Sequence, residues 1–212
     1  VILTASNKEQ ADAYQTQIDA RLEAGRLPKE TTYRVLPDPD GKRVGSGGAT
    51  LNVLRYIREH AAGKQSLAAV PHSAVQGDGA AESRQFVSAQ PGEAACHAFD
   101  GKRILVIHSG GDSKRVPQYS ACGKLFSPVP RILPNGRRST LFDEFMIAMC
   151  GVAARMNAGM LVCSGDVLLL FNPLQIDFYG KGAAALSIKE PAEIGKNHGV
   201  YRRDREENVG GF

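Results

Sequence analysis

The residues that decide the fold are Ile104-Leu105-Val106-Ile107, which run directly into His108-Ser109-Gly110-Gly111. Four consecutive apolar residues, mostly β-branched, indicate a central strand that is covered on both faces, and the glycines predict a tight turn at its carboxyl end. A second apolar strand is predicted at Met160-Leu161-Val162-Cys163, ending at Ser164-Gly165-Asp166. Shorter strands are predicted over residues 1–5, 33–36, 183–188 and 199–201.

Helical patterns alternate with these strands. Apolar residues at spacings of three and four predict helices over residues 8–26, 50–62 and 140–157, the last capped by Ser139. This alternation predicts a doubly wound, mostly parallel α/β sheet of the Rossmann-like type. The 212 residues correspond to a single domain, or to part of one cut short on its carboxyl side. Residues 63–99, rich in Gly, Ala, Ser and Gln, are interpreted as a variable insertion.

Composition excludes several classes of protein. The 26 Lys and Arg residues against 22 Asp and Glu give a net charge of +4, which is too small a bias to indicate a nucleic-acid partner. The longest apolar stretch, residues 167–171, is far shorter than the roughly 20 residues of a membrane span, so no membrane partner is expected. Four cysteines in no metal-binding spacing favour a cytoplasmic protein.

Basic residues gather between Lys102 and Arg138, where eight of them stand against one acidic residue. Such a cluster suits a small anion better than a long polyanion. Gly110 and Gly111 follow the central strand, so their backbone N–H groups could approach a phosphate, and Lys114 and Arg115 add positive charge. The alternative is a plain turn with a solvated Lys-Arg pair. The spacing matches neither the dinucleotide-binding nor the P-loop pattern.

Three other segments carry residues suited to phosphate chemistry. The glycine-rich stretch over residues 45–48 either lines a nucleotide or forms a tight strand-to-helix turn. Lys124 lies in a proline-bounded segment that would fix its direction. Asp166, at a strand exit, either binds Mg²⁺ or caps a turn. His108 is expected to be a hydrogen-bonded structural residue, and His198 is a candidate ligand contact.

Taken together, these segments resemble one family. Residues Arg43 to Asn52 resemble the amino-terminal signature of fucose-1-phosphate guanylyltransferase domains. Residues His108 to Pro117, followed by Gly123-Lys124, are similar to the phosphate-binding signature of sugar-nucleotide pyrophosphorylases, in the form found in bifunctional L-fucokinase/GDP-L-fucose pyrophosphorylases. Gly165-Asp166-Val167 and Asn197-His198-Gly199-Val200 follow in the family's order.

The resemblance implies an enzyme that joins GTP and L-fucose 1-phosphate, with Mg²⁺, to give GDP-L-fucose and pyrophosphate. It assigns Arg115, with Lys114, to the leaving pyrophosphate and Lys124 to the sugar phosphate or α-phosphate. The nucleotide would be lined by Gly45, Ser46, Gly47, Gly48, Gly110 and Gly111, the metal held by Asp166, and the substrate contacted by Asn197 and His198. No clear second metal-binding acid follows Asp166. Bifunctional members also carry a carboxy-terminal sugar kinase domain.

Two other functions remain open on the sequence. The first is an L-fucose kinase, which would use the glycine-rich stretch over residues 45–48 for the phosphates of ATP. The second is a non-catalytic module that binds a nucleotide or a sugar phosphate. Product formation from ATP would favour the kinase, and tight binding without turnover would favour the module.

Overall fold

The computed structural model describes residues 1–67, 98–111, 117–119, 123–167, 171–176, 182–196, 199–203 and 209–211. These residues belong to two compact units, Val1–Phe178 and Tyr179–Phe212, each of which is described by itself. Among the described helices, none combines the length and the apolar content needed to cross a bilayer.

The first unit is built on a parallel sheet of four strands in the order β2-β1-β3-β6. The strands are β1 (Ile2–Ala5), β2 (Arg34–Pro37), β3 (Arg103–His108) and β6 (Gly159–Ser164). β1 and β3 occupy the centre, and β6 pairs with β3 along its full length. The prediction of a doubly wound parallel α/β sheet is therefore confirmed.

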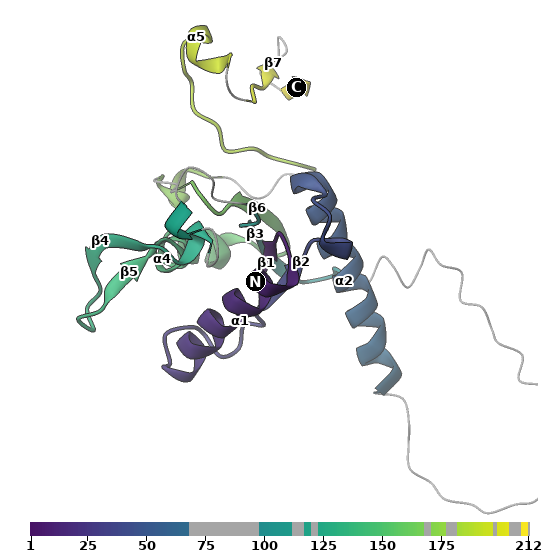
Figure 1. Ribbon diagram of the computed structural model, residues 1–212. Coiled ribbons are helices and arrows are strands. Elements are labelled where there is room, and N and C mark those ends of the chain that lie inside the picture. Colours follow the sequence, from purple (N-terminus) through teal and green to yellow (C-terminus); the bar gives the residue numbers. More distant parts are fainter. Residues whose placement is uncertain are drawn as a thin grey trace, which may run out of the picture. The chain divides into compact units, whose positions relative to one another are not determined.

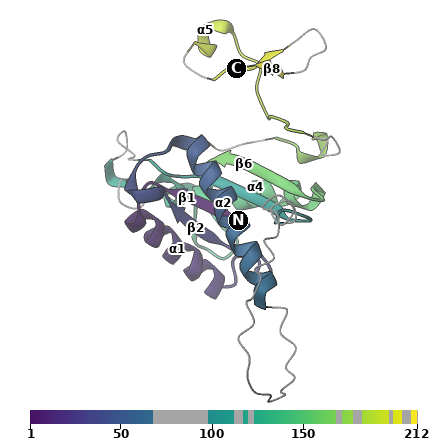
Figure 2. The ribbon, with the colours of Figure 1, turned by 90° about the vertical axis from the view of Figure 1, so that its right-hand side faces the viewer.

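Helices cover both faces of this sheet (Figure 1). Helices α1 (Lys8–Glu23) and α4 (Leu141–Arg155) pack on the face that carries Leu3 and Ile107. Helix α2 (Gly45–Leu67) packs through Val53 and Ile57 on the opposite face, which carries Ile2 and Val106. Successive strand residues point to opposite faces, so the all-apolar strands feed both cores. In Figure 2 the viewer faces α2, which crosses in front of the strands.

Helix α2 starts five residues earlier than the expected position 50. Gly45, with φ of 68°, leads directly into the first turn, and the Thr50 hydroxyl donates to the Ser46 carbonyl at 2.9 Å. A Cβ on Gly48 would lie 2.6 Å from the Val44 Cβ, so this position requires glycine. Glycines weaken a helix interior, but the first N–H groups of a helix lack intrahelical acceptors in any case, so the cost at a helix start is small.

One helix cap is as expected from the sequence and one differs. Asn7 caps α1 by accepting from the Gln10 N–H at 2.8 Å. Thr140, rather than Ser139, caps α4, because Thr140 and Asp143 form a reciprocal capping box. Ser139 is fully buried, and its hydroxyl donates to Glu144 instead.

The proline-containing segment before α4 forms a hairpin. Strands β4 (Pro128–Ile132) and β5 (Arg138–Thr140) pair antiparallel. A short 3₁₀ turn, Lys124–Phe126, precedes the hairpin, and Leu125 in this turn is buried. The segment is therefore more regular than the sequence indicated.

The second unit contains helix α5 (Ala192–Gly195) and the antiparallel strands β7 (Arg202–Arg203) and β8 (Val209–Gly211). The strands predicted over 183–188 and 199–201 are wrong, because neither described stretch forms one. Leu186 and Ile188 are 54% and 82% exposed, so their apolar pattern is not matched by burial in a sheet. In the region interpreted as an insertion, residues 63–67 complete α2, and residues 68–97 lie outside the described part.

Candidate functional site

A pocket of about 330 Å³ opens at the carboxyl ends of the parallel strands. Its lining comes from the residues at and after each strand end, as expected for an open α/β sheet. They include Thr4 and Ser6 at the end of β1, Asp38 after β2, His108 to Gly111 at β3, and Ser164 to Asp166 at β6. The first turn of α2 and the Lys124 turn complete the lining.

Lys124 and Asp166, both predicted site residues, meet in this pocket. The Lys124 Nζ lies 3.8 Å from the Asp166 Oδ2, and the Ser164 hydroxyl donates to the Asp166 Oδ1 at 2.6 Å. The side chains are 34% and 55% exposed, so a ligand can reach both. They stand 42 positions apart in the sequence, and only the fold brings this cation and this carboxylate together.

Gly110 and Gly111 also line this pocket. A Cβ on Gly110 would lie 3.2 Å from the Ser6 backbone nitrogen, so the turn after β3 passes closely over the turn after β1. A Cβ on Gly165 would lie 2.9 Å from the Ser109 Cβ. The turns that follow β1, β3 and β6 therefore pack so closely that a side chain at Gly110 or Gly165 would push them apart. Gly111 has open space around it, which leaves its backbone accessible to a ligand.

Tyr14, on α1, supports both the β3 turn and the Lys124 turn from below. Its hydroxyl donates to the Ser109 carbonyl at 3.1 Å, and the residue is fully buried. A Cβ on Gly123 would lie 1.6 Å from the Tyr14 hydroxyl oxygen, and Gly123 has φ of 68°. Only glycine therefore fits before Lys124. Tyr14 belongs to the helix predicted over residues 8–26, and nothing in the sequence indicated that it contacts site residues.

His108 joins three elements at the pocket floor. Its Nδ1 lies 3.1 Å from the Thr4 hydroxyl and its Nε2 lies 2.9 Å from the Thr50 hydroxyl. Because the Thr50 hydroxyl donates its own proton to Ser46, the fitting tautomer carries its proton on Nε2 and accepts from Thr4 at Nδ1. Burial lowers the pKa of His108, and the nearby Asp38 only partly opposes this. His108 is a hydrogen-bonded structural residue, as expected.

Asp38 and Arg43 line the pocket, although sequence reasoning singled out neither as a ligand-binding residue. Burial raises the pKa of the Asp38 carboxyl above its ordinary value. A hydrogen bond from the Val44 N–H and the charges of Arg43 and His108 lower the pKa, but by less than burial raises it. The Asp38 N–H donates to the Ala5 carbonyl at 2.8 Å, which fixes the residue at the end of β2. Its position after a strand was the available signal, but the surrounding Pro-Asp-Pro-Asp-Gly composition indicated only a turn.

The glycine-rich stretch is divided by the start of α2. Gly45 and Ser46 line the pocket, whereas Gly47 and Gly48 are not among its lining residues. The stretch is therefore a helix start whose first residues face the pocket, where free N–H groups and the helix dipole favour a negative or electron-rich group.

Several predicted site residues lie outside the described part of the chain. These are Lys114, Arg115, Asn197 and His198. Their roles remain predictions. Among the described residues, no three His, Cys, Asp or Glu side chains lie close enough together to hold a metal ion.

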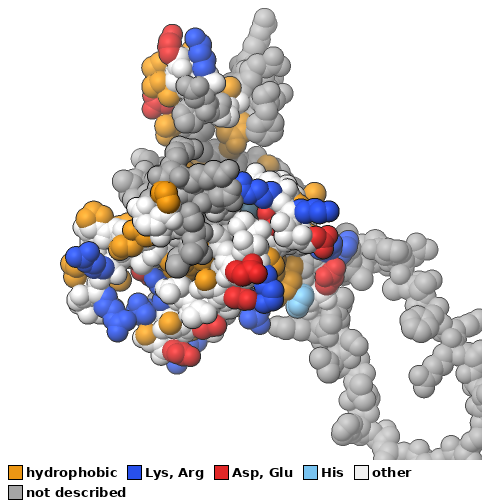
Figure 3. Space-filling view, in the orientation of Figure 1, with side chains coloured by type: hydrophobic (Ala, Val, Ile, Leu, Met, Phe, Trp, Pro, Cys, Tyr) orange, Lys and Arg blue, Asp and Glu red, His pale blue; other side chains and the backbone are white. Residues whose placement is uncertain are grey.

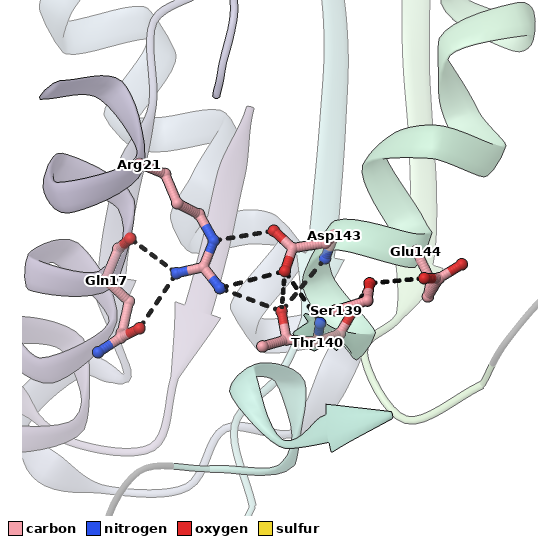
Figure 4. A network of polar contacts seen from close by, with 6 residues as sticks. All are labelled: Gln17, Arg21, Ser139, Thr140, Asp143 and Glu144. Carbon is pink, nitrogen blue, oxygen red and sulfur yellow. Dashed lines mark hydrogen bonds and ion pairs between the residues drawn. The ribbon is translucent and has the colours of Figure 1, made fainter. Parts of the chain in front are cut away.

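A buried polar network lies beneath the Lys124 turn (Figure 4). Arg21 of α1 donates to both oxygens of Asp143 at 2.9 and 3.4 Å, and to the Thr140 hydroxyl at 3.1 Å. Its guanidinium also lies 5.0 Å from the centre of the Phe126 ring. Burial alone would raise the pKa of Asp143, but the hydrogen bonds from Arg21 and Thr140 bring it below its ordinary value. The network ties α1 to the start of α4 and to the residue that ends the Lys124 turn.

Some exposed charged side chains elsewhere on the surface form pairs of opposite sign. Lys8 pairs with Asp12 at 2.6 Å, and Arg55 lies 3.9 Å from Glu59. On the face drawn in Figure 3, some acidic side chains lie beside basic ones, and other basic side chains lie apart from any acid. Exposed pairs of this kind contribute little to stability.

Comparison with known proteins gives a consistent result. Residues 97–210, just over half of the chain, match the fucose pyrophosphorylase domain. The chain is 34% identical to the bifunctional fucokinase/GDP-fucose pyrophosphorylase of Arabidopsis thaliana, with 99% of the chain aligned. It is 30% and 28% identical to the fucose-1-phosphate guanylyltransferases of Homo sapiens and Mus musculus, over 96% and 95% of its length.

The aligned region is a small part of each relative. The chain spans 19% of the Arabidopsis protein and 28% of each mammalian protein. No solved structure matches the chain significantly.

Proposed function

Because the chain belongs to the fucose pyrophosphorylase domain family, we propose that it provides the nucleotide- and phosphate-binding part of an enzyme that makes GDP-L-fucose. The substrates are GTP and L-fucose 1-phosphate, and the second product is pyrophosphate. The observation that carries this proposal is the meeting of Lys124 and Asp166 beside Gly110 and Gly111 in one pocket. The names of the mammalian relatives support the choice of substrates.

In the proposed reaction, an oxygen of the sugar phosphate attacks the α-phosphorus of GTP in line. A new P–O bond forms, and the bond between the α-phosphorus and the bridging oxygen breaks, so that pyrophosphate leaves. Reactions of this kind need little covalent help and depend on positioning and charge neutralisation. Lys124 would neutralise the α-phosphate or the sugar phosphate, and the backbone at Gly111 would approach the phosphates. Lys114 and Arg115 would hold the pyrophosphate.

The pocket also has a group that suits Mg²⁺. Asp166 offers hard carboxylate oxygens, one of them oriented by Ser164. Magnesium commonly binds through one or two carboxylates, with substrate phosphates and water as its other ligands, so a single protein carboxylate fits. We propose that Asp166 holds the ion, which when bound would offset the negative charge of the triphosphate. The Lys124 ammonium, 3.8 Å away, places a positive charge beside this carboxylate.

The test is product formation by the full-length protein from GTP, L-fucose 1-phosphate and Mg²⁺. The Lys124→Ala substitution is expected to lower kcat/KM roughly hundredfold, which is typical for the loss of one charged contact to the transition state. The matched control is Lys8→Ala, because Lys8 is an exposed lysine on α1 that lines no part of the pocket. Absence of GDP-L-fucose with the unaltered protein, or equal activity of the two variants, would contradict the proposal.

A sugar kinase and a cytoplasmic location remain predictions for the full-length protein. For the described part of this chain, the pocket at the strand ends favours nucleotidyl transfer over the kinase. The glycine-rich stretch forms the first turn of a helix instead of a phosphate-binding loop. A non-catalytic module would show binding of GTP without pyrophosphate release in the same assay.

A further inference from the structure

The pocket has two ends with different chemistry. Asp166 follows β6, and Asp38 follows β2, which lies at the other edge of the sheet. Three strand spacings separate these edges, or about 14 Å. A magnesium ion binds oxygens at about 2 Å, so it joins only carboxylates that lie close together, and these two follow strands at opposite edges of the sheet. Asp38 therefore needs a role other than sharing the metal proposed at Asp166.

Asp38 places a carboxylate at the β2 end, where it lies near the charge of Arg43 and the start of α2. A carboxylate repels phosphate oxygens and attracts N–H and O–H donors. The phosphates belong instead at the β6 end, where the Lys124 ammonium and the glycine turn lie. If the nucleotide extends along the strand ends, its nucleoside reaches the β2 end. The donors on a guanosine are the base N1–H, the 2-amino group and the ribose hydroxyls.

The residues around Asp38 hold its carboxylate in place and leave it able to accept further hydrogen bonds. The carboxyl accepts from the Val44 N–H and lies near the charges of Arg43 and His108, while the Asp38 backbone N–H donates to the Ala5 carbonyl. An ionised carboxylate has about four acceptor sites, so one backbone bond leaves others for a ligand. Nearby, His108 has both ring nitrogens engaged with threonine hydroxyls, so it is not available to read a base. The adjoining start of α2 presents only small residues, Gly45, Ser46 and Ala49, which leaves room for a ring.

We propose that the Asp38 carboxylate accepts hydrogen bonds from N1–H and the 2-amino group of guanine, and thereby selects GTP. This inference rests on the proposed function for the placement of the phosphates. Adenine presents an unprotonated N1 at the same edge, so its lone pair would face the carboxylate. Inosine triphosphate retains N1–H but lacks the 2-amino group, so it can make only one of the two bonds.

Equilibrium binding to the full-length protein tests the assignment with GTP, ITP, ATP and XTP, measured by calorimetry in Mg²⁺. The unaltered protein should bind GTP roughly tenfold or more tightly than ITP, and more tightly still than ATP. In Asp38→Asn the amide oxygen can still accept from Val44, but the amide nitrogen now donates. That change should weaken GTP roughly tenfold or more and strengthen XTP relative to GTP, because xanthine has a carbonyl in place of the 2-amino group.

The control is Asp40→Asn, which alters an exposed acid two residues along the same turn and outside the pocket lining. It should leave all four affinities unchanged. Equal weakening of all four nucleotides by Asp38→Asn would indicate a ribose contact or a structural role and would overturn the proposal. So would equal affinities of the unaltered protein for GTP and ITP, a comparison that needs no variant.

The proposed function and this inference can fail separately. A guanine preference that depends on Asp38, without formation of GDP-L-fucose, would leave the inference standing and remove the function. Formation of GDP-L-fucose with a base preference that ignores Asp38 would do the reverse.

Discussion

Two ion pairs in this molecule serve opposite purposes. Arg21 and Asp143 are 5% and 12% exposed and meet at 2.9 Å within a full set of hydrogen bonds. Lys124 and Asp166 are 34% and 55% exposed and meet at 3.8 Å. The buried pair has no room for a ligand and fixes two helices, whereas the open pair faces the pocket and can exchange its partner. Burial and geometry, rather than charge alone, separate the structural pair from the candidate functional pair.

The largest effect is expected from breaking the buried pair. Arg21→Met leaves the Asp143 carboxylate without its main partner, which should lower the free energy of unfolding by about 3–5 kcal/mol. Chemical denaturation measures this directly. Adding Asp143→Asn to Arg21→Met should recover part of the loss, because the unpaired charge is then gone. A loss below about 1 kcal/mol would show that the pair is not structurally important.

The same pair should make the free energy of unfolding depend on pH in the acidic range. The folded state lowers the pKa of Asp143 below its ordinary value of 3.8. Its contribution is therefore fully present above that ordinary value and is lost as the pH falls through the lower, folded value. Denaturation midpoints measured from pH 6 downward should fall less steeply in Arg21→Met than in the unaltered protein, since Arg21 is a main cause of the low pKa. Parallel curves would contradict this assignment.

An intermediate effect is expected from the residue that supports both site turns. Tyr14→Phe removes the hydroxyl that donates to Ser109 and should lower the free energy of unfolding by about 1 kcal/mol. Because the β3 turn and the Lys124 turn both rest on Tyr14, KM should rise as well. Tyr56→Phe on α2 is a matched control, because Tyr56 does not line the pocket and should leave KM unchanged. Equal KM values for both variants would limit Tyr14 to a packing role.

The smallest effect on stability is expected from the open pair. Lys124→Met should change the free energy of unfolding by no more than about 0.5 kcal/mol, since an exposed pair at this distance contributes little. The same substitution should nevertheless abolish most of the activity. A large loss of stability would mean that Lys124, like Arg21, serves the fold.

The sequence predicted most of the fold because its strongest signals are local. The apolar runs of β3 and β6 and the apolar stripes of α1 and α4 depend on neighbouring residues. The start of α2 was misplaced because four residues of glycine and serine disfavour a helix on propensity alone. The strand predicted over 183–188 failed because a strand needs a pairing partner, which a short apolar pattern cannot reveal.

Some residues of the candidate site could likewise be predicted from the sequence, and others could not. Gly110, Gly111 and Asp166 could be predicted, because the ends of parallel strands converge at one edge of a sheet. Lys124 was predicted from its proline-bounded segment and from the family resemblance instead. Tyr14 and Arg21 could not be predicted, because their contacts join residues 95 and 122 positions apart. Asp38 sits at a strand end too, but its pocket role emerges only once β2 is placed beside β1.

The most direct test of the account is the Mg²⁺ dependence of pyrophosphate release from GTP and L-fucose 1-phosphate, compared between the full-length protein and its Asp166→Asn variant. We expect the variant to melt at the same temperature, to need a higher Mg²⁺ concentration for its half-maximal rate and to turn over more slowly. A variant with the unaltered rate and the unaltered Mg²⁺ dependence would show that the pocket at the strand ends is not where nucleotidyl transfer occurs.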